Sequence, residues 1–224
     1  MSDNILMLSG GLDSTVLAHS LQQDGISFDS IFFDANKKST MKELEHARYN
    51  GLKIGKRFEL VDISAVNKSF VGYVTSNYVL LDELDRGGDT HITPGFSDSV
   101  GPTGFPIILS IASYLGQISQ RKNIYIGITK EQADLVPTTR KFFESWGETL
   151  SLLNGSNFPI KIETPFIDMT KSEIITLGKK LKVDFSRSWS CMYDLPAQCG
   201  TCPRCIERKG AFKKAKVKDN TVYL

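Results

Sequence analysis

The sequence predicts an α/β fold in which helices cover both faces of a doubly wound parallel β-sheet. Short apolar runs rich in isoleucine, valine and phenylalanine alternate along the 224 residues with longer segments of helical periodicity. Such alternation is typical of parallel sheets, because each crossover helix packs back onto the sheet. Four cysteines lie close together after the last periodic segment. We therefore expect one α/β domain followed by a metal-binding tail.

The expected strands and helices follow one another in βαβ order. Apolar runs predict strands at residues 5–8, 30–34, 58–63, 124–128 and 160–163. Helical periodicity predicts helices at residues 13–23, 41–51, 107–120, 139–153 and 171–181. Between residues 68 and 106 the alternation stops, and glycine and proline accumulate in the second half. We expect a long loop over the site there, or else a surface insertion, because loops of that length are uncommon unless they are functional.

The composition is that of an ordinary globular protein, with 41% apolar and 23% charged residues. The net charge of +2 is too small an excess to indicate a surface that binds nucleic acid. No run approaches the roughly 20 apolar residues of a membrane span, and the first residues, Met-Ser-Asp-Asn, lack a basic region followed by a hydrophobic stretch. We expect a cytoplasmic protein with a domain at residues 1–185 and a cysteine-rich segment, residues 186–224, packed on it.

The segment SGGLDST, residues 9–15, joins the first strand to the first helix. Unpaired N–H groups and the positive end of the helix dipole attract anions there. Glycines let the backbone approach phosphate oxygens, and the hydroxyl groups add donors. A carboxylate repels a neighbouring phosphate unless a divalent cation lies between them. We therefore expect Asp13 to bind Mg²⁺. A plain turn with an aspartate N-cap is the alternative, which the position after a strand disfavours. The expected phosphate contacts come from Ser9, Gly10, Gly11, Leu12, Asp13, Ser14 and Thr15.

The four cysteines of the tail are Cys191, Cys199, Cys202 and Cys205. Their spacing lets four thiolates surround one ion, and an all-thiolate tetrahedral shell leaves no position for water. We therefore expect structural Zn²⁺. An iron–sulfur cluster accepts the same four ligands, and unrelated free thiols are the third alternative.

The loop Ser-Gly-Gly-x-Asp-Ser resembles the PP-loop of the N-type ATP pyrophosphatases, which have the adenine nucleotide alpha hydrolase-like (HUP) fold. The segment TKSEI, residues 170–174, and the tail SWSCMYDLPAQCGTCPRCIERKGAF, residues 188–212, extend the likeness over nearly the whole chain. Together these segments resemble the 7-cyano-7-deazaguanine synthase family, QueC.

The resemblance implies an AMP-forming carbon–nitrogen ligase that uses ATP, Mg²⁺ and Zn²⁺. Its substrate would be the carboxylate of 7-carboxy-7-deazaguanine, which ATP activates as an acyl adenylate. Ammonia then gives the amide, and a second activation gives the nitrile, preQ0. The implied catalytic residues are Asp13, Ser14, Lys171 and Arg140, and the implied ATP site adds Asp34 and Gly127 to the loop. Lys171 is alternatively a solvated lysine at a helix start, and Arg140 alternatively a surface ion pair.

Three short segments that help to shape the pocket depart from the family's pattern. Val136, Thr138 and Thr139 stand where the family has tyrosine, aspartate and cysteine, and residues 34–37 and 102–105 also differ. The nucleophile therefore stays open between ammonia and an amine on a partner protein, as in QueC-like proteins of antiphage operons.

An aromatic side chain is expected to stack on the purine, and the candidates are Phe33, Tyr193 and Trp189. Two other classes of function share the loop. A tRNA-modifying enzyme of the PP-loop type needs thiols apart from the metal and a basic surface. A non-catalytic nucleotide-binding subunit would bind ATP without releasing pyrophosphate. The basic residues of the tail, Lys209, Lys213, Lys214, Lys216 and Lys218, are typical of a solvated helix face. A homodimer is compatible with the sequence, although no motif indicates one.

Overall fold

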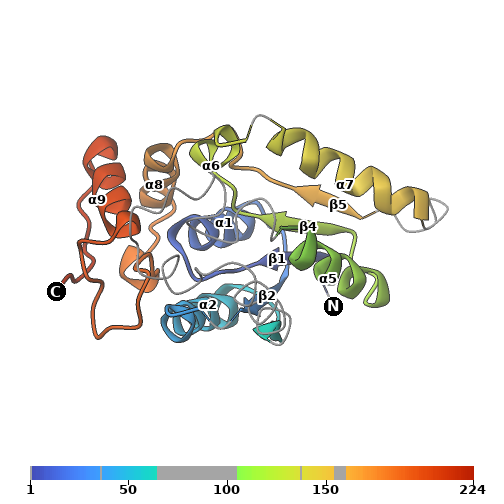
Figure 1. Ribbon diagram of the computed structural model, residues 1–224, viewed down its shortest axis with the longest axis horizontal. Helices are drawn as coiled ribbons and strands as arrows, with labels where there is room; N and C mark the ends of the chain where they lie inside the picture. Colours follow the sequence, from blue (N-terminus) through green and yellow to red (C-terminus); the bar gives the residue numbers. More distant parts are fainter. Residues whose placement is uncertain (1, 36, 65–104, 137, 154–159) are drawn as a thin grey trace, which may run out of the picture.

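The computed structural model of the chain describes residues 2–35, 37–64, 105–136, 138–153 and 160–224 (Figure 1). The expected loop at residues 68–106 lies outside the described residues, except for its last two residues, which begin a helix.

Five parallel strands form one sheet in the order β3-β2-β1-β4-β5. They are β1 (Asn4–Met7), β2 (Asp29–Asp34), β3 (Phe58–Asp62), β4 (Asn123–Ile126) and β5 (Lys161–Glu163). All five expected strands are confirmed, with small shifts at their ends. The strand order reverses between β1 and β4, and ligands of doubly wound folds bind where the carboxyl ends of two such strands diverge. The segment at residues 9–15 lies at that place.

All five expected helices are also present. They are α1 (Leu12–Gln23), α2 (Thr40–Ile54), α5 (Phe105–Ile118), α7 (Thr139–Leu153) and α8 (Lys171–Lys180). Among the described residues, three elements had not been predicted: α6 (Lys130–Asp134), the 3₁₀ helix η2 (Phe185–Arg187) and α9 (Pro203–Ala215). Helix α9 supports the interpretation of the basic run as a helix face, because Lys213 and Lys214 are exposed on it.

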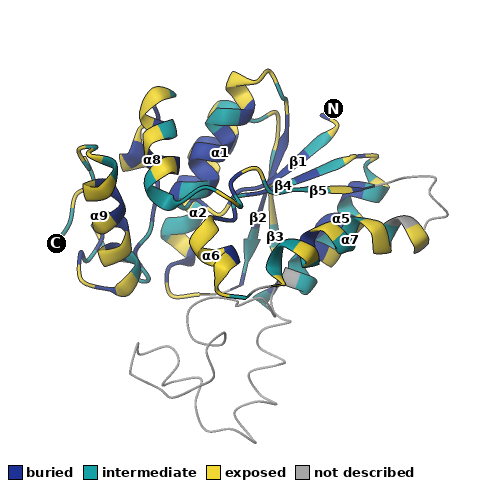
Figure 2. Cartoon of the chain, turned by 90° about the horizontal axis from the view of Figure 1, so that it is seen from above, coloured by how far each residue is buried: buried dark blue, intermediate teal, exposed yellow. Residues whose placement is uncertain are grey.

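Side chains of the strands alternate between two hydrophobic layers, as a period of two requires. Leu6, Leu8 and Phe32 pack on the side that α1, α2 and α8 cover. Ile5, Met7 and Ile31 pack on the opposite side, under α5 and α7. Figure 2 shows α5 and α7 together on one side of the sheet and α1 and α8 on the other. The alternation therefore places helices on both faces and leaves the carboxyl edge of the sheet for the site.

Arg208 of α9 connects the cysteine-rich segment to the rest of the chain. Its side chain is 1% exposed, and its guanidinium donates to the Phe185 carbonyl and forms an ion pair with Asp219 at 3.4 Å. It also donates to three hydroxyl groups, those of Ser188, Ser190 and Thr221. Ala211 and Phe212 join the hydrophobic layer of α1 and α8. A buried guanidinium with this many partners stabilises one specific arrangement of the tail. The boundary at residue 185 stays a prediction.

Gly10 lies where three parts of the chain meet. Its φ is +75°, and a Cβ at this position would lie 2.1 Å from the Glu43 carbonyl oxygen of α2. Its own carbonyl accepts the N–H of Trp189 from the tail at 2.9 Å. Glycine is therefore required at residue 10 both by conformation and by space.

A matched pair of substitutions separates these two requirements. Gly25 also has a positive φ, +71°, but a Cβ there would meet nothing within 4 Å. We expect Gly25→Ala to lower the free energy of unfolding by about 1 kcal/mol through conformation alone. Gly10→Ala should cost about 2 kcal/mol more, because the backbone of α2 must also move. Denaturant unfolding measures both, and equal losses would show that the α2 contact is no constraint.

Candidate active site

Residues 9–15 form a compact turn that leads from β1 into α1. The Ser9 and Ser14 hydroxyls lie 3.0 Å apart, and the Gly11 N–H donates to the Ser9 hydroxyl at 3.3 Å. Gly11 is the N-cap of α1, and within the described residues no side chain caps this helix. The first N–H groups of α1 therefore keep their capacity to donate to an anion.

Gly127 brings the end of β4 against the same turn. A Cβ at Gly127 would lie 3.1 Å from the Ser14 amide nitrogen and 3.2 Å from its Cα. Both neighbours are backbone atoms, so a side chain here would push β4 away from the start of α1. Asp34 ends β2 at the same edge of the sheet. The predicted ATP-site residues after β1, β2 and β4 are thus gathered at one edge.

Asp13 is a poorly solvated carboxylate in the first turn of α1. Its side chain is 16% exposed, and Lys171 Nζ lies 3.7 Å from its Oδ2. Within the described residues its Oδ1 is buried without a hydrogen-bond partner. Burial raises the pKa of Asp13, Lys171 opposes that rise, and the carboxylates of Glu207 and Glu131 add to it. A buried carboxylate oxygen without a donor suits a cation, as the proposed Mg²⁺ requires.

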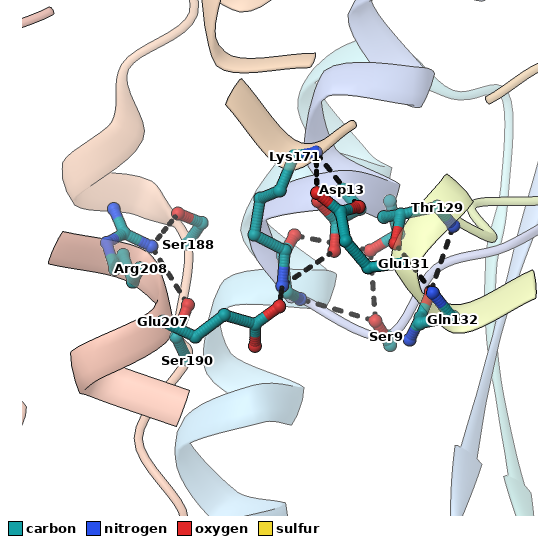
Figure 3. A network of polar contacts seen from close by, with 12 residues as sticks. Ser9, Asp13, Thr129, Glu131, Gln132, Lys171, Ser188, Ser190, Glu207 and Arg208 are labelled. Carbon is teal, nitrogen blue, oxygen red and sulfur yellow. Dashed lines mark hydrogen bonds and ion pairs between the residues drawn. The ribbon is translucent and has the colours of Figure 1, made fainter. Parts of the chain in front are cut away.

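Lys171 begins α8 and turns its side chain toward Glu207 and Asp13, as Figure 3 shows. Its ammonium donates to Glu207 Oε1 at 2.7 Å. Although burial opposes it, the two carboxylates raise the pKa of Lys171, so the side chain is an ammonium. The side chain is only 13% exposed. Lys171 is therefore not the solvated helix-start lysine that the sequence also allowed.

Arg140 of α7 is bound by its own neighbours. Its guanidinium pairs with Asp134 at 3.1 Å and with Asp168 at 2.9 Å, and it donates to the Ile167 carbonyl at 3.3 Å. The half-exposed Arg140 thus forms a surface ion pair, which was the alternative to a catalytic role in the sequence analysis. The catalytic role of Arg140 stays a prediction. The altered residues Val136 and Thr138 lie between α6 and α7, and Thr139 begins α7 just before Arg140, whereas Pro137, Asn36 and residues 102–104 lie outside the described residues.

Two acidic residues of this cluster were not predicted. Glu131 accepts the backbone N–H of Lys171 with both carboxylate oxygens, at 3.0 and 3.1 Å, and Glu207 binds the ammonium. Glu131 could have been found from the sequence, because it lies in the capping box Thr129–Gln132 that begins α6. A second capping box, Thr170–Glu173, begins α8 at Lys171. No local pattern marks Glu207.

The four cysteine sulfurs all lie within 4.8 Å of one another. Four thiolates around one zinc ion at a Zn–S distance of about 2.3 Å would lie about 3.8 Å apart, so the set fits a single ion after a small contraction. The N–H groups of Thr201 and Cys202 donate to Cys199 Sγ at 3.5 and 3.2 Å. Although burial opposes them, these donors lower the pKa of Cys199 to about 6. Cys199 therefore favours the thiolate, which is the form that binds metal, whereas burial raises the pKa of Cys191 and of Cys205.

The aromatic candidates differ in burial. Trp189 is 6% exposed, and its ring stacks on His46 with the centroids 5.7 Å apart. It packs with the cysteines, so its ring is a core residue in this conformation. Phe33 and Tyr193 are partly buried, and stacking on a purine stays a prediction for them.

In the part of the chain that the structure describes, no helix has both the length and the apolar character needed to cross a bilayer.

Comparisons with known proteins agree with this architecture. The family model described as "Queuosine biosynthesis protein QueC" matches residues 3–216. The 7-cyano-7-deazaguanine synthase of Methanobrevibacter smithii is 34% identical to this chain, over 98% of the chain and 96% of the relative. The enzyme of the same name from Campylobacter fetus is 30% identical, again over 98% and 96%.

Solved structures show a similar fold at low identity. The NMN synthetase of Francisella tularensis superposes with a TM-score of 0.53 and 13% identity, over 97% of this chain and 78% of its own. The U34-tRNA thiolase NcsA of Methanococcus maripaludis, solved with its [4Fe-4S] cluster, gives 0.52 and 15%, over 95% and 67%. These likenesses support the HUP-type sheet and say nothing of activity. Since the family model and the relatives span almost the whole sequence, the chain belongs to the QueC family.

Proposed function

We propose that this chain is an AMP-forming ligase that activates the carboxylate of 7-carboxy-7-deazaguanine with ATP. The observation that carries the proposal is the pairing of Asp13 and Lys171 at the uncapped start of α1. The relatives are named 7-cyano-7-deazaguanine synthases, and a nitrile on such a ring is the expected product of carboxylate activation.

Activation transfers AMP to the acid. A carboxylate oxygen of the substrate attacks the α-phosphorus, the bond to the β-phosphate oxygen breaks, and pyrophosphate leaves with the electron pair. The N–H groups of α1 and the Lys171 ammonium would stabilise the negative charge that grows on pyrophosphate. Asp13 would hold Mg²⁺, which when bound neutralises phosphate charge. Ser14 and Gly127 bring the loop to the edge where the two strands diverge.

Ammonia is the proposed nucleophile. It attacks the acyl adenylate carbon, AMP leaves, and loss of a proton gives the amide. A second ATP activates the amide oxygen, and loss of AMP and of the amide protons gives the nitrile. An amine on a partner protein would use the same adenylate. Val136, Thr138 and Thr139 depart from the family's pattern, so a protein amine stays a second candidate nucleophile.

The two other classes of function fit less well. All four cysteines of the sequence gather in one cluster, so no thiol is left for sulfur transfer to tRNA. A non-catalytic subunit would also hold ATP with Asp13 and Lys171, but the relatives are named synthases, which favours a ligase. Turnover decides between them and the proposed ligase.

The protein should release AMP and pyrophosphate from ATP and Mg²⁺ only when 7-carboxy-7-deazaguanine is present. Asp13→Asn should lower that rate by at least about 100-fold, because the cation loses its protein ligand. Asp24→Asn, at the exposed end of the same helix, should leave the rate unchanged. A coupled pyrophosphate assay measures the rates, and acid-independent release or none at all would contradict the proposal.

Asp13→Asn should also raise the melting temperature of the nucleotide-free protein. The folded-state pKa of Asp13 is raised, so the fold binds this proton more tightly than the unfolded chain does. Ionised Asp13 therefore destabilises the fold above the ordinary aspartate pKa, and the neutral amide removes that cost. The gain should shrink as the pH falls toward that ordinary value, and calorimetry at several pH values checks it. A lower melting temperature at neutral pH would show that Asp13 stabilises the fold.

The purified protein should hold one zinc ion per chain, with no iron or acid-labile sulfide. Cys202→Ser should lose the metal and lower the melting temperature, because an incomplete thiolate shell binds zinc weakly. Ile206→Ala, exposed beside Cys205, is the matched control. Elemental analysis gives the metal content. Iron with sulfide would replace the zinc proposal by an iron–sulfur cluster.

With ammonia present, the product should be the free amide and then the free nitrile. Mass spectrometry of the reaction identifies both. Mass spectrometry of proteins encoded beside this gene, co-expressed with it, tests the other acceptor. A mass gain equal to a deazaguanine acyl group on such a protein, without free nitrile, would assign the amine as the nucleophile.

A further inference from the structure

The cysteine-rich segment reaches the candidate site at two points, one on the loop of residues 9–15 and one on Lys171 of α8. The Trp189 N–H donates to the Gly10 carbonyl at 2.9 Å. Glu207 of α9 accepts the Lys171 ammonium at 2.7 Å, on the side opposite the contact with Asp13. The first contact fixes backbone, whereas the second bears directly on a charged group of the candidate site.

The backbone end of Lys171 is fixed without any help from Glu207. Its N–H donates to the Glu131 carboxylate, and the capping box of Thr170 and Glu173 sets the first turn of α8. The ammonium lies beyond a flexible four-carbon stem, which can take many rotamers. The contacts at the far end are Glu207 at 2.7 Å and Asp13 at 3.7 Å. Glu207 therefore makes the shorter of the two contacts that choose the rotamer.

The backbone of Glu207 is held in place by its neighbours, although its side chain is 44% exposed. Cys205, two residues before it, is buried in the sulfur cluster. Arg208, the next residue, is buried and bonded to four groups of the tail and to the Phe185 carbonyl. Helix α9 also packs along α8. The backbone that carries Glu207 is thus held on both sides and next to the helix that carries Lys171.

We propose that Glu207 is a positioning residue that holds the Lys171 ammonium at the phosphate site, so that the cysteine-rich tail sets the geometry of ATP cleavage. This inference rests on the proposed function. It assigns the tail a role in the reaction beyond stabilising the fold. Glu207 acts through Lys171 and need not touch the nucleotide.

Steady-state pyrophosphate release tests the proposal in the full chain. Glu207→Ala should lower kcat about 10- to 100-fold, since small misplacements of a stabilising group cost that much, with KM for ATP changed far less. Glu207→Gln keeps an oxygen acceptor for the ammonium and should stay within about threefold of the unsubstituted protein. Glu148→Ala, an exposed glutamate of α7, should have no effect. A Glu207→Ala variant with unchanged kcat would overturn the proposal.

A double-mutant cycle separates positioning from a general structural effect. If Glu207 acts through Lys171, Glu207→Ala should cost nothing further in a Lys171→Ala background. Multiplying losses would overturn the proposal. Glu207→Lys, which sets a cation against Lys171, is a second disruptive variant and should match Glu207→Ala. Metal content and melting temperature should be unchanged in these variants, and kcat losses that track metal loss would also overturn it.

Chemical labelling of Lys171 provides a readout that needs no turnover. With limiting acetic anhydride, followed by peptide mass spectrometry, Lys171 should acetylate several-fold faster in Glu207→Ala than in the unsubstituted protein or in Glu148→Ala. Equal rates would overturn the positioning role even if the enzyme is active. If the unsubstituted protein releases no pyrophosphate, the proposed function fails and the labelling still decides on Glu207.

Discussion

The arrangement of the site depends on one crowded point, the backbone of Gly10. Its Cα faces the Glu43 carbonyl of α2, and its carbonyl accepts the N–H of Trp189. The loop is therefore not a free turn between β1 and α1, because helix α2 and the tail both define its path. A change that disturbs the tail, such as loss of the proposed metal, is expected to reach the loop through this hydrogen bond.

The second constraint on the site is its charge. Asp13 and Glu207 face the ammonium of Lys171, Glu131 accepts the backbone N–H of the same residue, and Arg204 contributes a weaker field. Without a ligand this cluster has an excess of negative charge, which would repel a triphosphate. A divalent cation reverses that balance, so binding of nucleotide and of cation should be strongly coupled. The stability that the ionised Asp13 costs the empty fold is consistent with a group kept for binding.

The sequence predicted secondary structure best in long segments with a regular hydrophobic period. The five strands and five helices follow from hydrophobic alternation, and the loop at residues 9–15 follows from the position of its glycines. Helix α9 was hidden because its buried positions, Cys205, Arg208, Ala211 and Phe212, include a charged residue and a metal ligand. Helix α6 is too short for periodicity and is marked only by its capping box. The contact of Glu207 with Lys171 joins distant segments, so no local pattern predicts it.

These contacts separate the candidate phosphate site from the segment that departs from the family's pattern. The sheet and α1 position the candidate phosphate site, and solved structures of only 13–15% identity share the fold. Arg140, in the first turn of α7, is occupied by Asp134 and Asp168 and follows the residues that depart from the family's pattern. Changes there can alter the acceptor without disturbing Gly10, Asp13 or Lys171. Under the proposed function we therefore expect activation and acceptor choice to depend on different segments, which would allow a family to keep one reaction step while the next one diverges.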